Sequence, residues 1–108
     1  MEKFNTMNRD IITQQGSDYI LKLELLGNNN LPYSFEDEDE LHIHFSDIKG
    51  AKVVSQEIDI SEFENPLTHL ITSEFLSVFT SNPIKYKLIL MKPDITLTLL
   101  TGNIYREN

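Results

Sequence analysis

Apolar and polar side chains alternate along most of this chain with a period of two residues, the pattern of half-buried β-strands. The clearest segment is 40–47, where Leu41, Ile43 and Phe45 alternate with two histidines and a serine. The segment 84–91 follows the same rule. We expect both segments to be strands with one face toward a core.

Alternation also predicts further strands at 9–16, 17–26, 51–58 and 95–107. In the second of these, helical spacing would instead bring Tyr19, Leu23 and Leu26 together, so both periods stay open there. The last strand should pair with 84–91 as a hairpin, because Pro93 presets φ in the turn between them. Gly102 inside the last strand predicts a bulge or a bend.

Residues 61–80 lack this alternation. Thr72 or Ser73 is a plausible N-cap, and the apolar residues of SEFLSVF fall at helical spacing. We therefore predict one short helix or helical turn at about 73–79, which ends before Pro83.

The layout of these elements predicts an all-β fold, an antiparallel β-sandwich with one short helix. Residues 1–8 should form a flexible N-terminal arm, and 9–108 a single domain. A ferredoxin-like α+β fold needs two long amphipathic helices, and the sequence offers at most one. The predicted core consists of Tyr19, Leu21, Leu23, Leu41, Ile43, Phe45, Phe75, Tyr86, Leu88, Leu97 and Leu99.

Composition narrows the function classes. The 108 residues include 9 basic and 17 acidic ones, a net charge of −8, which disfavours binding to nucleic acid and to anionic membranes. No apolar stretch approaches the roughly 20 residues that span a bilayer, and the first residues have no apolar signal-peptide region. Because there is no Cys, disulfides, thiolate metal sites and thiol nucleophiles are excluded.

The stretch EDEDELHIHFSD at 36–47 raises the question of a metal site. Period two aims the rings of His42 and His44 to the same side of a strand, as a zinc site requires. Such a site needs further ligands, and His69, the only other histidine, has no spacing relation to these two. The favoured interpretation is a polar strand face without metal, with His42 and His44 as the minor metal candidates.

The acidic run 36–40 lacks the Gly that turns a calcium-binding loop. We expect a hydrated loop whose like charges extend the chain, with contact to a basic patch on a partner as the alternative. Lys85 and Lys87 are expected to face outward, where they either blunt a sheet edge or pair with carboxylates. Phe4, Tyr105 and Arg106 are the candidate interface residues, since exposed aromatic and Arg side chains anchor interfaces.

No nucleophile–base pair, H-E-x-x-H motif or glycine-rich phosphate loop occurs, so we expect no enzyme and no cofactor. The order of the segments ITQQG, SDYILKLELL, LHIHF, SEFLSVF, IKYKLILM and TLTLLTGNIYR resembles a known domain. This is the immunoglobulin-like β-sandwich at the N-terminus of phage baseplate upper proteins, with related domains in phage tail and head proteins. The resemblance covers roughly residues 9–106.

The resemblance implies an immunoglobulin-like fold and a non-catalytic structural role in a virion that is assembled in the host cytoplasm. The partners would be other virion proteins in a homo- or hetero-oligomer. The alternative is a module that binds a small ligand or a carbohydrate through the loops, although the chain has no Trp for a sugar platform. Departures from the family pattern include Asn82-Pro83, where relatives often have a Gly.

Overall fold

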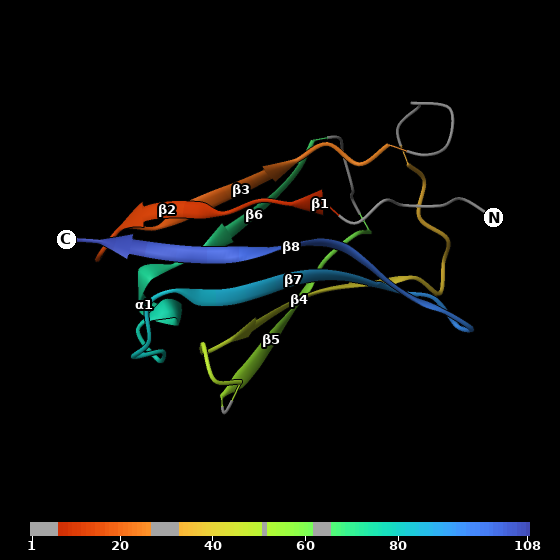
Figure 1. Ribbon diagram of the computed structural model, residues 1–108. Helices are drawn as coiled ribbons and strands as arrows, with labels where there is room; N and C mark the ends of the chain where they lie inside the picture. Colours follow the sequence, from red (N-terminus) through yellow and green to blue (C-terminus); the bar gives the residue numbers. More distant parts are fainter. Residues whose placement is uncertain (1–6, 27–32, 51, 62–65) are drawn as a thin grey trace.

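The computed structural model describes residues 7–26, 33–50, 52–61 and 66–108, most of which lie in strands (Figure 1). The elements are β1 (Met7–Asn8), β2 (Ile11–Gln14), β3 (Tyr19–Leu23), β4 (Glu40–Ser46), β5 (Val53–Ile58), β6 (Leu67–Ile71), α1 (Ser73–Leu76), β7 (Ile84–Met91) and β8 (Thr96–Glu107). The prediction of an all-β fold with one short helix is confirmed.

The strands form two sheets. The larger has the order β1-β8-β7-β4-β5, with β2 also paired to β8, and the smaller consists of β3 and β6. In Figure 1, β8 lies between β2 and β7. The predicted hairpin is confirmed, because β7 and β8 are antiparallel and Leu88 lies opposite Leu100.

The prediction of purely antiparallel pairing is wrong for the first strands. Both β1 and β2 run parallel to β8, with Met7 opposite Leu100 and Ile11 opposite Ile104. Alternation specifies a strand and its buried face, but the direction of pairing depends on the connection. After β2 the chain turns at Gly16, whose φ is +86°, and enters the other sheet instead of forming a hairpin.

The boundary of the predicted arm differs in the structure. Met7 and Asn8, which the sequence assigns to that arm, form β1 on the edge of β8. The remaining residues of the arm, 1–6, lie outside the described part of the chain.

Strand β6 is a feature that the sequence analysis missed. Leu67 and Ile71 are buried, while the residue between them on the same face is His69, which is half-buried. This polar residue interrupts the apolar alternation, so the segment resembles a loop. The segment is a strand because it pairs with β3, in which Leu21 lies opposite His69.

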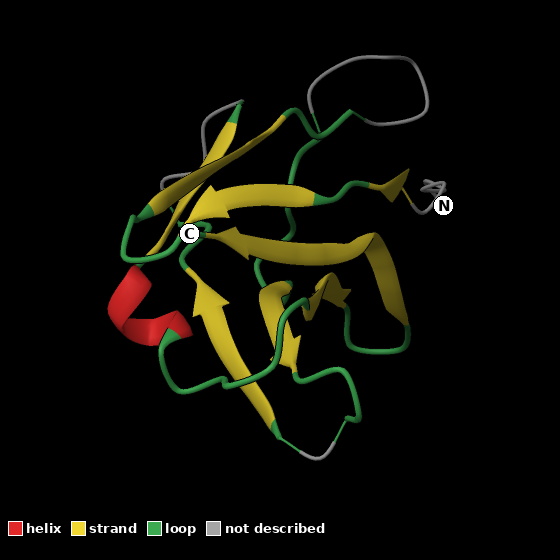
Figure 2. Ribbon diagram, turned by 60° about the vertical axis from the view of Figure 1, so that its left-hand side comes forward, coloured by secondary structure: helices red, strands yellow, loops and turns green. Residues whose placement is uncertain are grey.

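Helix α1 confirms the expected N-cap and is shorter than expected. The Phe75 amide donates to Thr72 Oγ1 at 3.1 Å, so Thr72 is the cap. The helix ends at Leu76, before the predicted end at residue 79. Figure 2 shows it as one short turn beside the strands.

Buried residues of both sheets form one hydrophobic cluster, to which Leu21 of β3 and Ile71 of β6 contribute from the smaller sheet. The predicted core residues are buried in it except for Tyr19, Phe75 and Leu97, which are partly buried against the same cluster. The two sheets therefore share a single core.

The bulge in β8 does not lie at Gly102. The register shifts where Leu88 pairs with Leu100 and Ile89 pairs with Thr98, which leaves one residue of β8 unpaired. Gly102 instead permits a close approach of two backbone segments. A Cβ there would lie 1.9 Å from the Arg9 carbonyl oxygen, so the absence of a side chain lets the segment between β1 and β2 approach β8.

The same segment is held by Tyr86, whose hydroxyl donates to the Arg9 carbonyl oxygen at 2.5 Å. Burial raises the pKa of Tyr86 to about 12. An unfolded tyrosine loses its proton near pH 10. In the folded state the Tyr86 hydroxyl keeps its proton to a higher pH. The stabilisation from its hydrogen bond to Arg9 is therefore complete below pH 10 and is lost as the pH rises to about 12.

Tyr86→Phe is therefore expected to reduce the free energy of unfolding by about 1–2 kcal/mol at neutral pH, because the Arg9 carbonyl loses its donor. The difference between wild type and variant should shrink between pH 10 and 12. Urea unfolding over this range measures it, with Tyr105→Phe, at an exposed position, as control. A constant difference at all pH values would contradict the prediction.

Candidate functional site

The outer face of β4 carries its charged and titratable side chains. The apolar residues of β4 fill the core, so Glu40, His42 and His44 point to the opposite side of the sheet. The ring centroids of His42 and His44 are 6.3 Å apart. The two minor metal candidates therefore do share one face.

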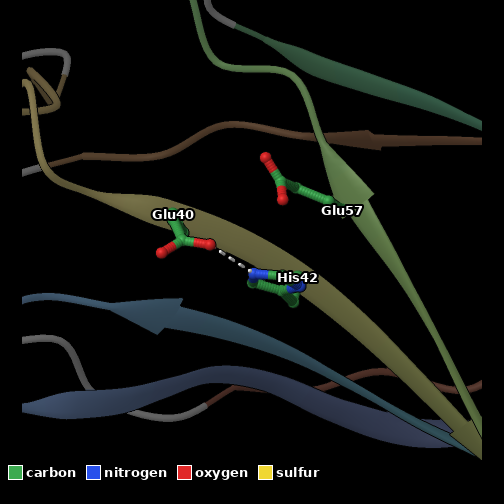
Figure 3. Close-up of side chains that lie close together, drawn as sticks. All are labelled: Glu40, His42 and Glu57. Atoms are coloured by element: carbon green, nitrogen blue, oxygen red, sulfur yellow. Dashed lines mark hydrogen bonds and ion pairs between the residues drawn. The ribbon is translucent and has the colours of Figure 1, made fainter.

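The register between β4 and β5 adds a residue that the sequence analysis did not consider. Glu57 of β5 lies directly opposite His42. The Nε2 atom of His42 is 3.2 Å from Oε1 of Glu40. One potential ligand atom from each of Glu40, His42 and Glu57 lies within 4.8 Å of the other two, and Figure 3 shows these side chains, which we call the Glu–His–Glu cluster.

The cluster is open to solvent on the carboxylate side. The side chain of His42 is 19% exposed and that of Glu40 is 56% exposed. Within the described residues, the Glu57 carboxylate has no hydrogen bond or ion pair. Two carboxylates close together repel each other. A cation bound between them would remove that repulsion.

The other two histidines have different surroundings. Burial, followed by the charges of His42 and Lys87, lowers the pKa of His44. Burial also lowers the pKa of His69, whose Nε2 lies 2.9 Å from Oε1 of Gln56. His69 belongs to β6 and Gln56 to β5, so this contact joins the two sheets and lies apart from the Glu–His–Glu cluster.

The acidic run is not the extended hydrated loop that the sequence suggests. It forms a tight turn in which the Asp39 amide donates to the Glu36 carbonyl at 3.1 Å and the Glu36 amide donates to Asp39 Oδ2 at 2.9 Å. The Asp39 side chain is fully buried and pairs with Lys92, with Nζ at 3.0 Å from Oδ2. Of the five acidic residues in this run, Asp39 points inward because it forms an ion pair with Lys92.

Lys92 lies in the same buried arrangement. Its Nζ is 5.7 Å from the centre of the Tyr33 ring. Burial alone would lower the pKa of Lys92, but hydrogen bonds and charge interactions with Tyr33 and Asp39 outweigh it and raise that pKa above its ordinary value. The lysine therefore stays charged and keeps Asp39 paired.

The exposed part of the acidic run borders a hollow at the ends of β4 and β5. This hollow has a volume of about 550 Å³. Its acidic lining residues are Glu36, Asp37, Asp39, Glu40, Glu57 and Asp59. Because Glu40 and Glu57 also belong to the Glu–His–Glu cluster, the cluster forms one side of a strongly acidic recess.

Lys85 and Lys87 are exposed on β7, as predicted. They do not blunt an edge, because β7 lies between β4 and β8 inside the larger sheet. The alternation indicates their face but not the position of the strand in the sheet.

Among the predicted interface residues, Tyr105 is 36% exposed and pairs in register with Ile12 of β2, which is 65% exposed. We call these two residues the Ile12–Tyr105 patch. Phe4 lies outside the described residues. On the smaller sheet, Ile20 and Leu70 form a second exposed apolar pair across β3 and β6.

The Arg106 side chain forms hydrogen bonds with backbone carbonyls of its own chain. Its guanidinium donates to the carbonyl oxygens of Leu76 and Phe79, each at 3.0 Å, and of Ser81 at 2.6 Å. These carbonyls follow or end α1, where a cation is favourable. Its backbone is also bonded to the Asn82 side chain at 3.0 and 3.2 Å.

Comparisons with known proteins add no relative: no family model, no curated protein and no solved structure matches this chain. None of the helices in the described residues has the length and apolar character needed to cross a membrane.

Proposed function

We propose that this chain is a non-catalytic structural module of a phage virion, an immunoglobulin-like β-sandwich that docks to other subunits of a baseplate, tail or head. The strand order supports the immunoglobulin-like assignment. An immunoglobulin sandwich pairs strands B and E in one sheet and strands G, F, C and C′ in the other. The pairing β3–β6 and the order β8-β7-β4-β5 correspond to these arrangements.

The observation that carries the docking proposal is the Ile12–Tyr105 patch. Two large side chains, one of them aromatic, are exposed beside each other on paired strands. Burying two adjacent apolar side chains against a partner would stabilise a complex, and tyrosine is enriched among the residues that contribute most to binding. The patch lies where β2 and β8 meet, so the docking partner would contact both strands.

The edge of the larger sheet offers a second mode of attachment. Strand β5 is the last in the order β1-β8-β7-β4-β5, and its outward-facing Val53 is 62% exposed. A partner segment can add to such an edge by main-chain hydrogen bonds. The net charge of −8 favours partners with basic surfaces at that contact.

The test is incorporation into particles. We expect the chain to be present in virions purified from the phage that encodes it, as measured by quantitative mass spectrometry. Complementation with an Ile12→Ser/Tyr105→Ser variant should reduce incorporation by about tenfold or more, because truncating an apolar interface anchor costs well over 1 kcal/mol.

The matched control is Val78→Ser, which removes another exposed apolar side chain, 43% exposed, outside the patch. It should be incorporated like wild type. Circular dichroism establishes that both variants fold. Absence of the chain from purified particles, together with a monomer that binds no virion protein, would overturn the proposal.

A further inference from the structure

The Glu–His–Glu cluster has the chemistry of a metal site, a possibility independent of the proposed docking role. Its three side chains come from two adjacent strands whose register places Glu57 opposite His42. Glu40 lies two residues before His42 and hence on the same face. The β4 backbone is paired on both sides, to β5 and to β7, so the positions of two of the three ligands are fixed by the sheet.

The separations agree with coordination of a small divalent ion. Zinc binds His nitrogen at about 2.0–2.1 Å and carboxylate oxygen at about 2.0–2.2 Å, so ligand atoms around a tetrahedral ion are roughly 3.3–3.5 Å apart. The 3.2 Å between Glu40 Oε1 and His42 Nε2 already matches this value. All three atoms lie within 4.8 Å of one another, so a rotation of the exposed Glu57 side chain completes the set.

The surroundings favour a cation at this point. The Glu57 carboxylate has no partner within the described residues, and the recess that includes Glu40 and Glu57 is lined by four further acidic residues, Glu36, Asp37, Asp39 and Asp59. Lys92 neutralises Asp39 and also lies 3.9 Å from Glu36, but the acidic side chains of the recess other than Asp39 remain exposed. A concave surface of one charge sign concentrates ions of the opposite sign.

We propose that Glu40, His42 and Glu57 bind one divalent transition-metal ion of the zinc type. An imidazole with two carboxylates suits zinc, whereas calcium and magnesium take oxygen ligands only. Three protein ligands leave a coordination position open for water or for a donor from a docked partner. The ion would also link edge strand β5 to β4 through Glu57 and His42.

Titration of the metal-free full chain with Zn²⁺ tests this inference. Calorimetry should give one zinc ion per chain, and NMR should place the largest shifts at His42 and Glu57. Glu57→Gln should weaken binding by at least about tenfold, since even indirect disturbance of a metal site costs that much. Zinc at about one hundred times Kd should raise Tm by on the order of 10 °C in wild type.

The matched control is Glu107→Gln, which removes the same charge from an exposed strand position on β8 and should bind zinc like wild type. His42→Ala should abolish both binding and the Tm shift; if it fails to fold, Glu57→Gln decides alone. Millimolar Mg²⁺ should not compete. Absence of binding at millimolar zinc, equal affinity of the two glutamine variants, or shifts centred on His69 would overturn the inference.

Discussion

Asp39→Ala is expected to lower the free energy of unfolding by about 3 kcal/mol, because it removes the buried partner of the Lys92 ammonium and leaves only the exposed Glu36 carboxylate, at 3.9 Å. The Lys92 side chain is only 16% exposed, and that of Asp39 is fully buried. The substitution also removes the acceptor for the Glu36 amide, so the turn before β4 loses a second contact. Urea unfolding followed by circular dichroism measures the loss.

Two further variants separate the ion pair from general effects of charge. Asp37→Ala removes a neighbouring exposed carboxylate and should change stability by no more than about 0.5 kcal/mol. Asp39→Ala/Lys92→Met removes both charges and should recover part of the loss. Equal effects of Asp37→Ala and Asp39→Ala would contradict the buried pair.

Gly102→Ala is expected to cost about 3 kcal/mol, at the upper end of the range for overpacked sites. The new Cβ would lie 1.9 Å from the carbonyl oxygen and 2.7 Å from the carbonyl carbon of Arg9, and backbone cannot yield as a flexible side chain does. Arg9 would have to move away from β8. This movement breaks the hydrogen bond from the Arg9 amide to the Thr101 carbonyl and the hydrogen bond from the Tyr86 hydroxyl to the Arg9 carbonyl.

Gly50→Ala is the comparison for this prediction. Gly50 has a φ of +72° and open space around it, so its substitution costs about 1–2 kcal/mol through backbone conformation alone. Hydrogen exchange distinguishes the two variants: Gly102→Ala should expose the amides of β2, whereas Gly50→Ala should not. Full protection of β2 in Gly102→Ala would rule out the close approach as the reason for this glycine.

The strands that alternation predicts best are those buried on one face. In β4, Leu41, Ile43 and Phe45 are completely buried, and β7 follows the same rule at Ile84, Tyr86 and Leu88. Period two identifies such strands because side chains of one face meet a core and those of the other meet solvent. It does not reveal whether a neighbour runs parallel or antiparallel, which is why the pairing of β2 was missed.

The remaining misses involve polar groups that meet partners distant in sequence. His69 faces inward because Oε1 of Gln56, on another strand, accepts a hydrogen bond there, so β6 lacks a continuous apolar face. Asp39 is buried because Lys92, 53 residues away, reaches it. Neither partner can be assigned from the local pattern, since both contacts depend on how the sheets are arranged.

The Glu–His–Glu cluster lies between these cases. Alternation places Glu40 and His42 on one face of a predicted strand, and it predicts a neighbouring strand at 51–58 that includes Glu57. The register that sets Glu57 opposite His42 depends on the length of the turn between the strands, which alternation does not specify. The distances that bring three ligand atoms together also depend on side-chain rotamers.

Strand β8 has consequences for how the protein is made. It pairs with β7 on one side and with β1 and β2 on the other, and the bond from Thr101 to Asn8 joins residues 93 positions apart. While the polypeptide is being synthesised, the first two strands emerge from the ribosome long before residues 96–107 exist to receive them. Their main-chain groups remain open to pairing with other nascent chains during that interval. Completion of the larger sheet is thus a late event, and such distant pairing makes folding slow.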